Sequence, residues 1–144
     1  MNHVWSVLCQ NSSVDEETKL LSIFNCLEQV EITVKKEDIE NKGKVIVPIL
    51  SELISFWTID GQKEGDKLEM KIESLDPSNN LLYSAEKTFD INKNFPRFRS
   101  KIKLQGLPVT KSGRYFFKIS QKDKIQKKFK TVATLPLDVD LRYA

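Results

Sequence analysis

The chain has 144 residues, of which 30% are charged and 40% apolar, which fits one folded globular domain over residues 1–144. Five glycines and five prolines exclude a low-complexity chain, and no stretch approaches the roughly 20 apolar residues of a transmembrane helix. The formal net charge is only +3, so the whole chain is not strongly basic.

Period-two alternation of apolar and polar residues runs through most of the chain. In the clearest example, Leu68, Met70 and Ile72 alternate with charged residues, as in a strand with one buried face. Strands are expected over roughly 3–10, 19–33, 47–60, 67–74, 81–90, 98–105, 113–121 and 125–141, the last broken near Thr134. Residues 35–44 are expected to form a solvated loop or a single helical turn. The pattern predicts an all-β, antiparallel β-sandwich of about seven to nine strands.

Two of these segments also fit a helical pattern. Apolar residues within 19–30 and 49–57 recur at helical spacing, and acidic residues precede the first segment. The first segment runs on into β-branched residues 30–34, and the second ends in Phe56-Trp57-Thr58-Ile59, which favours strands. The alternative is an α+β fold, if residues 19–30 are helical.

The compartment is inferred from the N-terminus and the cysteines. The first ten residues lack the basic start and the long apolar run of a signal peptide. Cys9 and Cys26 are too few for a disulfide framework or a zinc site. We therefore expect a cytoplasmic protein with no membrane partner, in which both thiols are buried and reduced. A disulfide between neighbouring strands is the alternative if the protein is exported.

Residues 100–117 resemble the strand E, E–F corner and strand F segment of immunoglobulin-like domains. In that pattern a leucine-bearing turn is followed by a small residue and then, two positions on, by a tyrosine, here Leu107, Gly113 and Tyr115. The resemblance implies an immunoglobulin-like β-sandwich in which the Tyr115 hydroxyl bonds to backbone a few residues upstream.

The same resemblance assigns two further positions. Phe117 takes the place of the strand F cysteine, and Trp57 that of the buried tryptophan of strand C. The chain departs from the pattern because it has no cysteine two residues after the tyrosine, and because Lys111 stands where an aspartate is usual. The resemblance therefore implies a sandwich without the inter-sheet disulfide.

The full chain also resembles a family of small, uncharacterised bacterial domains to which no activity is assigned. The matching features are Cys9 at the end of an apolar strand, residues 15–18, 21–25 and 75–77, residues 113–117 and the closing Leu135-Pro136-Leu137. This resemblance implies no activity.

The sequence contains no catalytic pattern that we recognise. His3 is the single histidine and is expected to be a solvated terminal side chain. Neither cysteine has a basic cluster nearby in sequence to activate it. Asp138 and Asp140 share one strand face and are expected to be solvated. We expect no enzyme activity, no cofactor and no metal site, and no small-molecule ligand is evident.

Charge is the distinctive feature of the sequence. The segment 92–130 carries +12, which leaves −9 for the remainder of a chain whose total is +3. Its only acid is Asp123, against 13 basic residues: Lys93, Arg97, Arg99, Lys101, Lys103, Lys111, Arg114, Lys118, Lys122, Lys124, Lys127, Lys128 and Lys130. In a sandwich these groups are expected to cover two faces, so that a single flat patch is not guaranteed.

The leading functional hypothesis is a non-catalytic interaction or assembly module that uses the basic surface of residues 97–130. Its partner would be an acidic protein surface or a second copy of the chain, which could also pair with open sheet edges. The alternative is a weak, sequence-independent nucleic-acid binder, and an enzyme is the third option. The plainest explanation is a solvated surface whose positive charge is balanced by the acidic remainder of the chain. The candidate binding residues are Arg97, Arg99, Lys101, Lys103, Arg114, Phe116, Lys118, Lys127 and Lys128.

Overall fold

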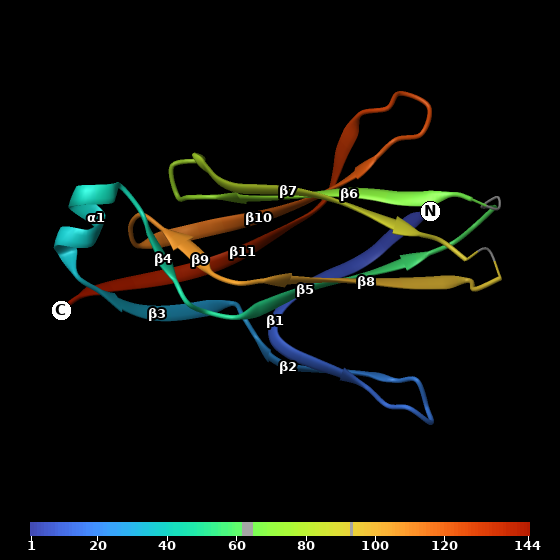
Figure 1. Cartoon of the computed structure of the whole chain (residues 1–144), viewed down its shortest axis with the longest axis horizontal. Helices are drawn as coiled ribbons and strands as arrows, with labels where there is room; N and C mark the ends of the chain where they lie inside the picture. The colour runs from blue at the N-terminus through green and yellow to red at the C-terminus, as the bar shows by residue number, and fades with distance from the viewer. Residues whose placement is uncertain (62–64, 93) are drawn as a thin grey trace.

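The computed structural model describes residues 1–61, 65–92 and 94–144, and the protein is mainly β, with 65% of it in strands (Figure 1). Within the described residues there are 11 strands in three sheets and one short helix. In chain order the elements are β1 (Asn2–Val14), β2 (Leu21–Cys26), β3 (Gln29–Val34), α1 (Lys36–Lys42), β4 (Val45–Val47), β5 (Ser51–Thr58), β6 (Lys67–Leu75), β7 (Leu81–Asp90), β8 (Arg97–Leu104), β9 (Leu107–Val109), β10 (Gly113–Lys122) and β11 (Phe129–Tyr143).

Two larger sheets and a two-stranded ribbon make up the fold. The four-stranded sheet has the order β2-β1-β5-β8, the five-stranded sheet has the order β3-β11-β10-β6-β7, and β4 pairs with β9. The expected all-antiparallel pairing is wrong at one place, because β3 lies parallel to β11. The expected count of seven to nine strands is also too low.

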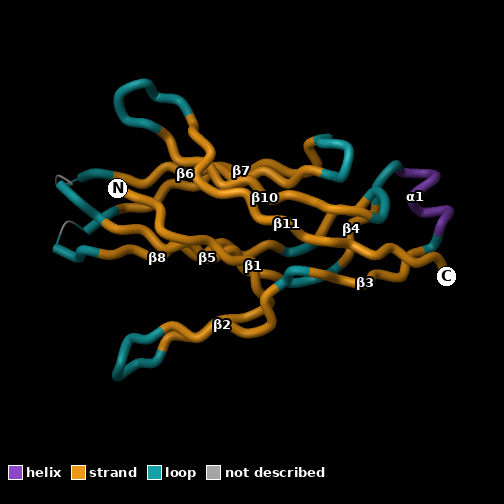
Figure 2. Tube along the Cα trace, turned by 180° about the vertical axis from the view of Figure 1, so that it is seen from behind, coloured by secondary structure: helices purple, strands orange, loops and turns teal. Residues whose placement is uncertain are grey.

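The four-stranded sheet is strongly curled, and the β1–β2 hairpin extends from it as an arm (Figure 2). Although β2 and β8 are its opposite edges, an Arg99 nitrogen on β8 donates to the Lys19 carbonyl in the β1–β2 turn, 3.2 Å away. Cys9 and Ile54 are buried on the face inside this curl, away from the main core cluster. One sheet thus forms a half-barrel.

Most strands lie where the alternation predicts them, with β6, β7, β8 and β10 within two residues of expectation. The helical alternative for 19–30 is wrong, since that segment forms β2 and the start of β3. The two strands separate at Leu27 and Glu28. The Leu27 N–H donates to the Leu8 carbonyl in the four-stranded sheet, and the Glu28 carbonyl accepts from the Asp138 N–H in the five-stranded sheet. The chain changes sheets at this point.

Three other boundaries differ from expectation. The segment 47–60 divides into the end of β4 and β5, and the short strand β9 was not predicted. The last strand is not broken near Thr134, but its pairing with β10 shifts register beside that residue, between Ala133 and Thr131. Residues 36–42 form a helix that ends at Gly43, which has a φ of 74°. Within the described residues no helix has the length and apolarity needed to cross a membrane.

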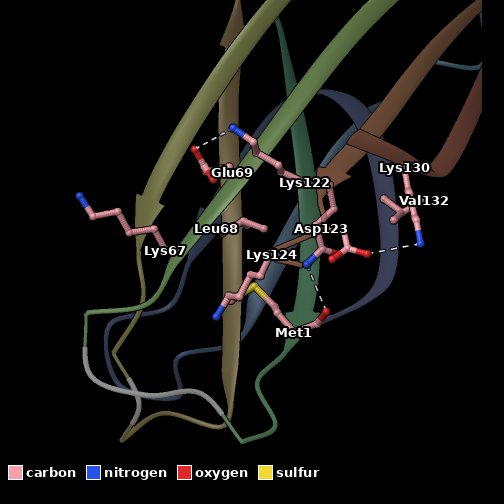
Figure 3. Close-up of a pocket in the computed structure, with 10 residues that line it drawn as sticks. Met1, Lys67, Leu68, Glu69, Lys122, Asp123, Lys124, Lys130 and Val132 are labelled. Carbon is pink, nitrogen blue, oxygen red and sulfur yellow. Dashed lines mark hydrogen bonds and ion pairs between the residues drawn. The ribbon is translucent and has the colours of Figure 1, made fainter. Parts of the chain in front are cut away.

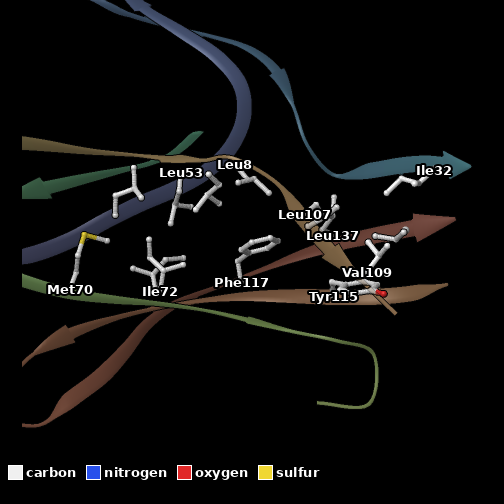
Figure 4. Packing of buried hydrophobic residues seen from close by; sticks show 14 of the residues in the cluster. Leu8, Ile32, Leu53, Met70, Ile72, Leu107, Val109, Tyr115, Phe117 and Leu137 are labelled. Atoms are coloured by element: carbon white, nitrogen blue, oxygen red, sulfur yellow. The ribbon is translucent and has the colours of Figure 1, made fainter. Parts of the chain in front are cut away.

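The core lies between the facing sheets, where inward side chains of both meet (Figure 4). The five-stranded sheet contributes Ile72, Tyr115 and Phe117, and the four-stranded sheet contributes Leu8 and Leu53. Each lies on the apolar face of its strand, because alternate residues of a strand point to opposite sides. Burial of these side chains supplies the main driving force for folding.

The Tyr115 hydroxyl fixes the connection between β9 and β10. It accepts hydrogen bonds from the N–H groups of Thr110, at 2.9 Å, and Lys111, at 3.1 Å, and donates to the Lys111 carbonyl at 2.6 Å. The expected bond to backbone upstream of the tyrosine is confirmed. Trp57 is fully buried, but the strand C position expected for it is wrong, because it lies on β5, which pairs with β1 and β8 and not with β10.

Asp76 ties a second turn to the same corner. Its carboxylate accepts hydrogen bonds from the N–H groups of Ser78 and Asn80, each at 2.8 Å, and from the Thr110 hydroxyl at 3.3 Å. Burial alone would raise the pKa of Asp76, but these bonds and that from the Asn80 side chain lower it below its ordinary value. The β6–β7 turn and the β9–β10 connection are thereby held together.

Replacement of Tyr115 by phenylalanine is expected to lower the free energy of unfolding by about 1–3 kcal/mol, because two partly buried N–H groups lose their acceptor. Urea denaturation measures the change. The matched variant Tyr143→Phe alters an exposed tyrosine and should stay within about 0.5 kcal/mol of the parent. Equal stability of the two variants would contradict the role assigned to the Tyr115 hydroxyl.

Candidate functional site

The structure brings four of the predicted binding residues into one row. Arg97, Arg99, Lys101 and Lys103 alternate along β8 with Phe98, Ser100, Ile102 and Leu104, which face the interior or are partly buried. Alternate side chains lie on one face about 7 Å apart. We call Arg97, Arg99, Lys101 and Lys103 the basic row. It lies on the outer face of β8, an edge strand that pairs only with β5 among the described residues.

Among the described residues, only Lys101 of the basic row has a carboxylate partner. The Lys101 ammonium lies 3.6 Å from the Glu52 carboxylate, which is largely buried and also accepts a 2.6 Å hydrogen bond from the Ser12 hydroxyl. Among the described residues no carboxylate lies within 4 Å of the charged groups of Arg97, Arg99 or Lys103. The row therefore keeps most of its positive charge for an external partner.

The turn between β1 and β2 lies beside the Arg97–Arg99 end of the basic row. Asp15 shapes this turn by accepting hydrogen bonds from the N–H groups of Thr18, at 2.7 Å, and Glu17, at 2.9 Å, and these bonds lower its pKa. Arg99 then holds the turn to β8 through the Lys19 carbonyl. The arm and the basic row consequently face each other across the curl.

A hollow of about 280 Å³ lies between the turn and the row. Its walls combine cations with apolar groups: Trp5, Lys19, Leu20, Leu21, Phe56, Arg97, Phe98 and Arg99. The rings of Trp5 and Phe56 have centroids 5.8 Å apart and planes inclined by 31°. Sequence reasoning missed this grouping, because Trp5 is brought near Arg99 by the pairing of β1 with β5 and of β5 with β8, and Leu20 by the β1–β2 turn that Arg99 contacts.

A second set of predicted residues lies on a different face. Arg114, Phe116 and Lys118 point outward from β10, in the middle of the five-stranded sheet. Arg114 makes two hydrogen bonds, of 2.7 and 3.1 Å, to the carboxylate of Asp138 directly opposite on β11, and they lower the pKa of Asp138. These seven predicted residues thus form two surfaces, and the charge of the second is partly neutralised.

The remaining predicted residues, Lys127 and Lys128, lie in the exposed β10–β11 loop. Beside this loop is a lysine-lined hollow of about 310 Å³ (Figure 3). Each of its four lysines has an acid partner, in the pairs Lys67–Asp90, Lys122–Glu69, Lys124–Asp66 and Lys130–Asp123, at 2.9 to 3.7 Å. This hollow therefore offers little unbalanced charge. Lys93, also in the basic segment, lies outside the described residues.

The two cysteines lie directly opposite each other on β1 and β2, and both are free. Cys9 is buried as expected, whereas Cys26 is exposed, so the prediction of two buried thiols is wrong for Cys26. Burial raises the pKa of Cys9, with further contributions from the charges of Glu52 and Cys26. A raised pKa disfavours the thiolate, which is the nucleophilic form of cysteine.

The sequence expectation of a solvated His3 is wrong. The ring is partly buried against Trp57, with centroids 5.1 Å apart, and Nε2 lies 2.7 Å from the Ser6 hydroxyl, which in turn contacts Ser55. Burial lowers the pKa of His3. Within the described residues, no carboxylate is hydrogen-bonded to the ring, so the third member of a nucleophilic triad is not seen there.

The acidic candidates are held in ion pairs. Asp138 binds Arg114, and Asp140 lies 3.4 Å from Arg142. Across residues 1–61, 65–92 and 94–144, no three His, Cys, Asp or Glu side chains gather in an arrangement that would hold a metal ion.

No protein-family model matches the chain, and no curated protein sequence matches it.

Acidification should destabilise the protein through His3. Because its pKa is lower in the folded chain than the ordinary value of 6.5, the unfolded chain takes up a proton first, and stability falls as the pH drops below about 6.5. Urea denaturation at pH 7.5 and 5.5 measures this slope. The variant His3→Gln, which does not titrate, should show a smaller loss between the two pH values. An unchanged slope would contradict the assignment.

Proposed function

We propose that this protein is a non-catalytic interaction module whose basic row on β8 binds an extended acidic segment of a protein partner. The observation that carries the proposal is the alignment of Arg97, Arg99, Lys101 and Lys103 on one face of an edge strand, with a carboxylate beside only Lys101 among the described residues. Complementary charge favours rapid and specific encounter with an acidic partner.

The geometry of β8 suits an extended partner. The second edge of the strand has no strand partner in the part of the chain that the structure describes. An added strand would take up the main-chain hydrogen bonds of that edge. Alternate acidic residues of the added strand would lie opposite the row, since both strands repeat about every 7 Å.

The hollow beside the row adds apolar contact. Trp5 and Phe56 lie within reach of Arg97 and Arg99, and aromatic and arginine residues are typical centres of protein interfaces. The face of β10 contributes less to the proposed interface because it lies on the other sheet and Arg114 is already paired with Asp138. A second copy of the chain is one source of an acidic segment, since the residues outside 92–130 carry −9.

We also propose an immunoglobulin-like fold and a cytoplasmic location for this protein. The order β3-β11-β10-β6-β7 opposite β1-β5-β8, together with the Tyr115 hydrogen bonds, supports an immunoglobulin-like sandwich extended by the curled arm. A cytoplasmic location is proposed because the free cysteines fit a reducing compartment. The resemblance to small bacterial domains implies no activity.

Single-stranded nucleic acid is the second candidate ligand. The Trp5–Phe56 pair beside Arg97 and Arg99 offers stacking surface next to phosphate-binding cations, the combination that single strands require. The two candidates differ in their response to salt, because the logarithm of nucleic-acid affinity falls linearly as the logarithm of salt concentration rises.

The variant Arg97→Glu/Arg99→Glu is expected to weaken binding of a fluorescent peptide of alternating glutamate and threonine by about tenfold or more. Fluorescence anisotropy with the full chain measures the affinity. The matched control, Lys35→Glu/Lys42→Glu, makes the same change in charge at exposed positions beside α1, at the opposite end of the molecule from the start of β8 (Figure 1), and should bind within about twofold of the parent.

Absence of peptide binding, or equal loss in both variants, would contradict a specific acidic-segment site. Labelled oligothymidylate serves as the second probe. Tight oligothymidylate binding that is lost in Trp5→Ala and falls steeply with salt would transfer the proposal to nucleic acid.

A further inference from the structure

A largely apolar hollow opens at the edge between the two larger sheets. Its volume is about 500 Å³, within the range of small-molecule sites. Its walls come from the start of β7, the end of β8 and the β4–β9 ribbon, with Ile46, Leu82, Leu104, Pro108 and Phe117 as the main apolar contacts. Ile46 is 65% exposed, so its apolar surface is left uncovered by the chain.

The hollow contains a buried hydroxyl without a hydrogen-bond partner. Ser74 is 1% exposed, and among the described residues its Oγ has no partner. In the sheet register Ser74 lies between Phe117 of β10 and Tyr83 of β7, and all three line the hollow. A buried polar atom that lacks a partner is costly and rare in folded proteins. At the wall of a hollow it marks a position where a ligand atom would complete the bonding.

The rim of the hollow carries positive charge. Lys44, which precedes β4, and Lys103, at the end of β8, both line it, and neither has a carboxylate within 4 Å among the described residues. Tyr83 is 38% exposed and brings a phenol to the same rim. The site thus combines an apolar body, a buried hydrogen-bonding group and cations at the entrance.

We propose that this hollow binds a small organic carboxylate with an apolar body, its carboxylate at Lys44 and Lys103 and a hydrogen-bonding group at its other end beside Ser74. An apolar cavity with a few convergent polar groups is the usual form of a small-molecule site. The sequence contained no sign of such a ligand, because the lining residues come from six separate strands and the loops beside them.

This site is separate from the acidic-segment surface, apart from Lys103, which belongs to both. The variants Lys44→Gln, Ser74→Ala and Leu82→Trp leave Lys103 unchanged, so they keep the basic row intact. The probes for this site are small carboxylates and a phenol, whereas the probe for the basic row is a peptide. A negative result with the small molecules therefore does not contradict the peptide site, and a negative result with the peptide does not contradict this site.

The ligand class can be tested on the full ¹⁵N-labelled chain by amide chemical shifts. Three probes separate the polar ends: 4-hydroxyphenylacetate carries both, phenylacetate lacks the hydroxyl, and 4-methylphenol lacks the carboxylate. We expect 4-hydroxyphenylacetate to shift amides around the hollow and to bind about fivefold more tightly than phenylacetate. Lys44→Gln should weaken both acids and leave 4-methylphenol unaffected.

Ser74→Ala supplies a readout that a purely structural serine would not give. The variant should unfold at the same or a higher temperature, because it removes a hydroxyl that lacks a partner. It should also bind 4-hydroxyphenylacetate and phenylacetate with equal affinity. A clear loss of stability, or an unchanged preference for the hydroxylated acid, would overturn the role given to Ser74.

Leu82→Trp fills the hollow and should abolish binding of all three probes, whereas Leu81→Trp, at an exposed neighbouring position outside the hollow, should leave it intact. Dispersed amide spectra establish that both variants fold. Probe binding that survives Leu82→Trp, or the absence of any shift around the hollow in the parent at millimolar probe, would overturn the site.

Discussion

The alternation of inward and outward residues over 114–119 of β10 is the constraint on which the rest of the structure depends. Tyr115, Phe117 and Ile119 must enter the core, and the same geometry forces Arg114 and Lys118 outward. On β8 the apolar side chains face the opposite sheet, so its cations also point outward, but on the other side of the molecule. Packing of one common core therefore divides the basic segment between two faces, and the local counter-charge decides which face remains positive.

The local alternation of apolar and polar residues predicted most strands. It did not predict the features that depend on contacts between segments far apart in the sequence. The alternation of Leu68, Met70 and Ile72 fixes β6 because neighbours in sequence share its burial. The division at Leu27-Glu28, by contrast, depends on Leu8 and Asp138, which belong to different sheets. The parallel pairing of β3 with β11 likewise has no local signal. The Tyr115 corner was predictable because all its hydrogen bonds lie within five residues.

The same distinction applies to the candidate sites. That Arg97, Arg99, Lys101 and Lys103 share a face follows from period two, whereas their neutralisation does not. In the sequence alone Arg114 counts among the unbalanced basic residues, although Asp138 lies opposite it on β11 and forms an ion pair with it. The hollow at Ser74 gave no signal in the sequence, because a serine among alternating apolar residues looks like an ordinary inward position. Only the folded structure shows that Ser74 lines a hollow and that, among the described residues, its hydroxyl has no hydrogen-bond partner.

The pairing of β3 also bears on the order in which the chain can fold. β3 spans Gln29–Val34, and its only strand partner in the described residues is β11, more than 100 residues later. During synthesis β1 and β2 can pair early, but one edge of the five-stranded sheet must wait for the last strand. Such long-range closure slows folding and leaves apolar Val30, Ile32 and Val34 uncovered on a growing chain. The basic residues that precede β11 would help keep that waiting chain in solution.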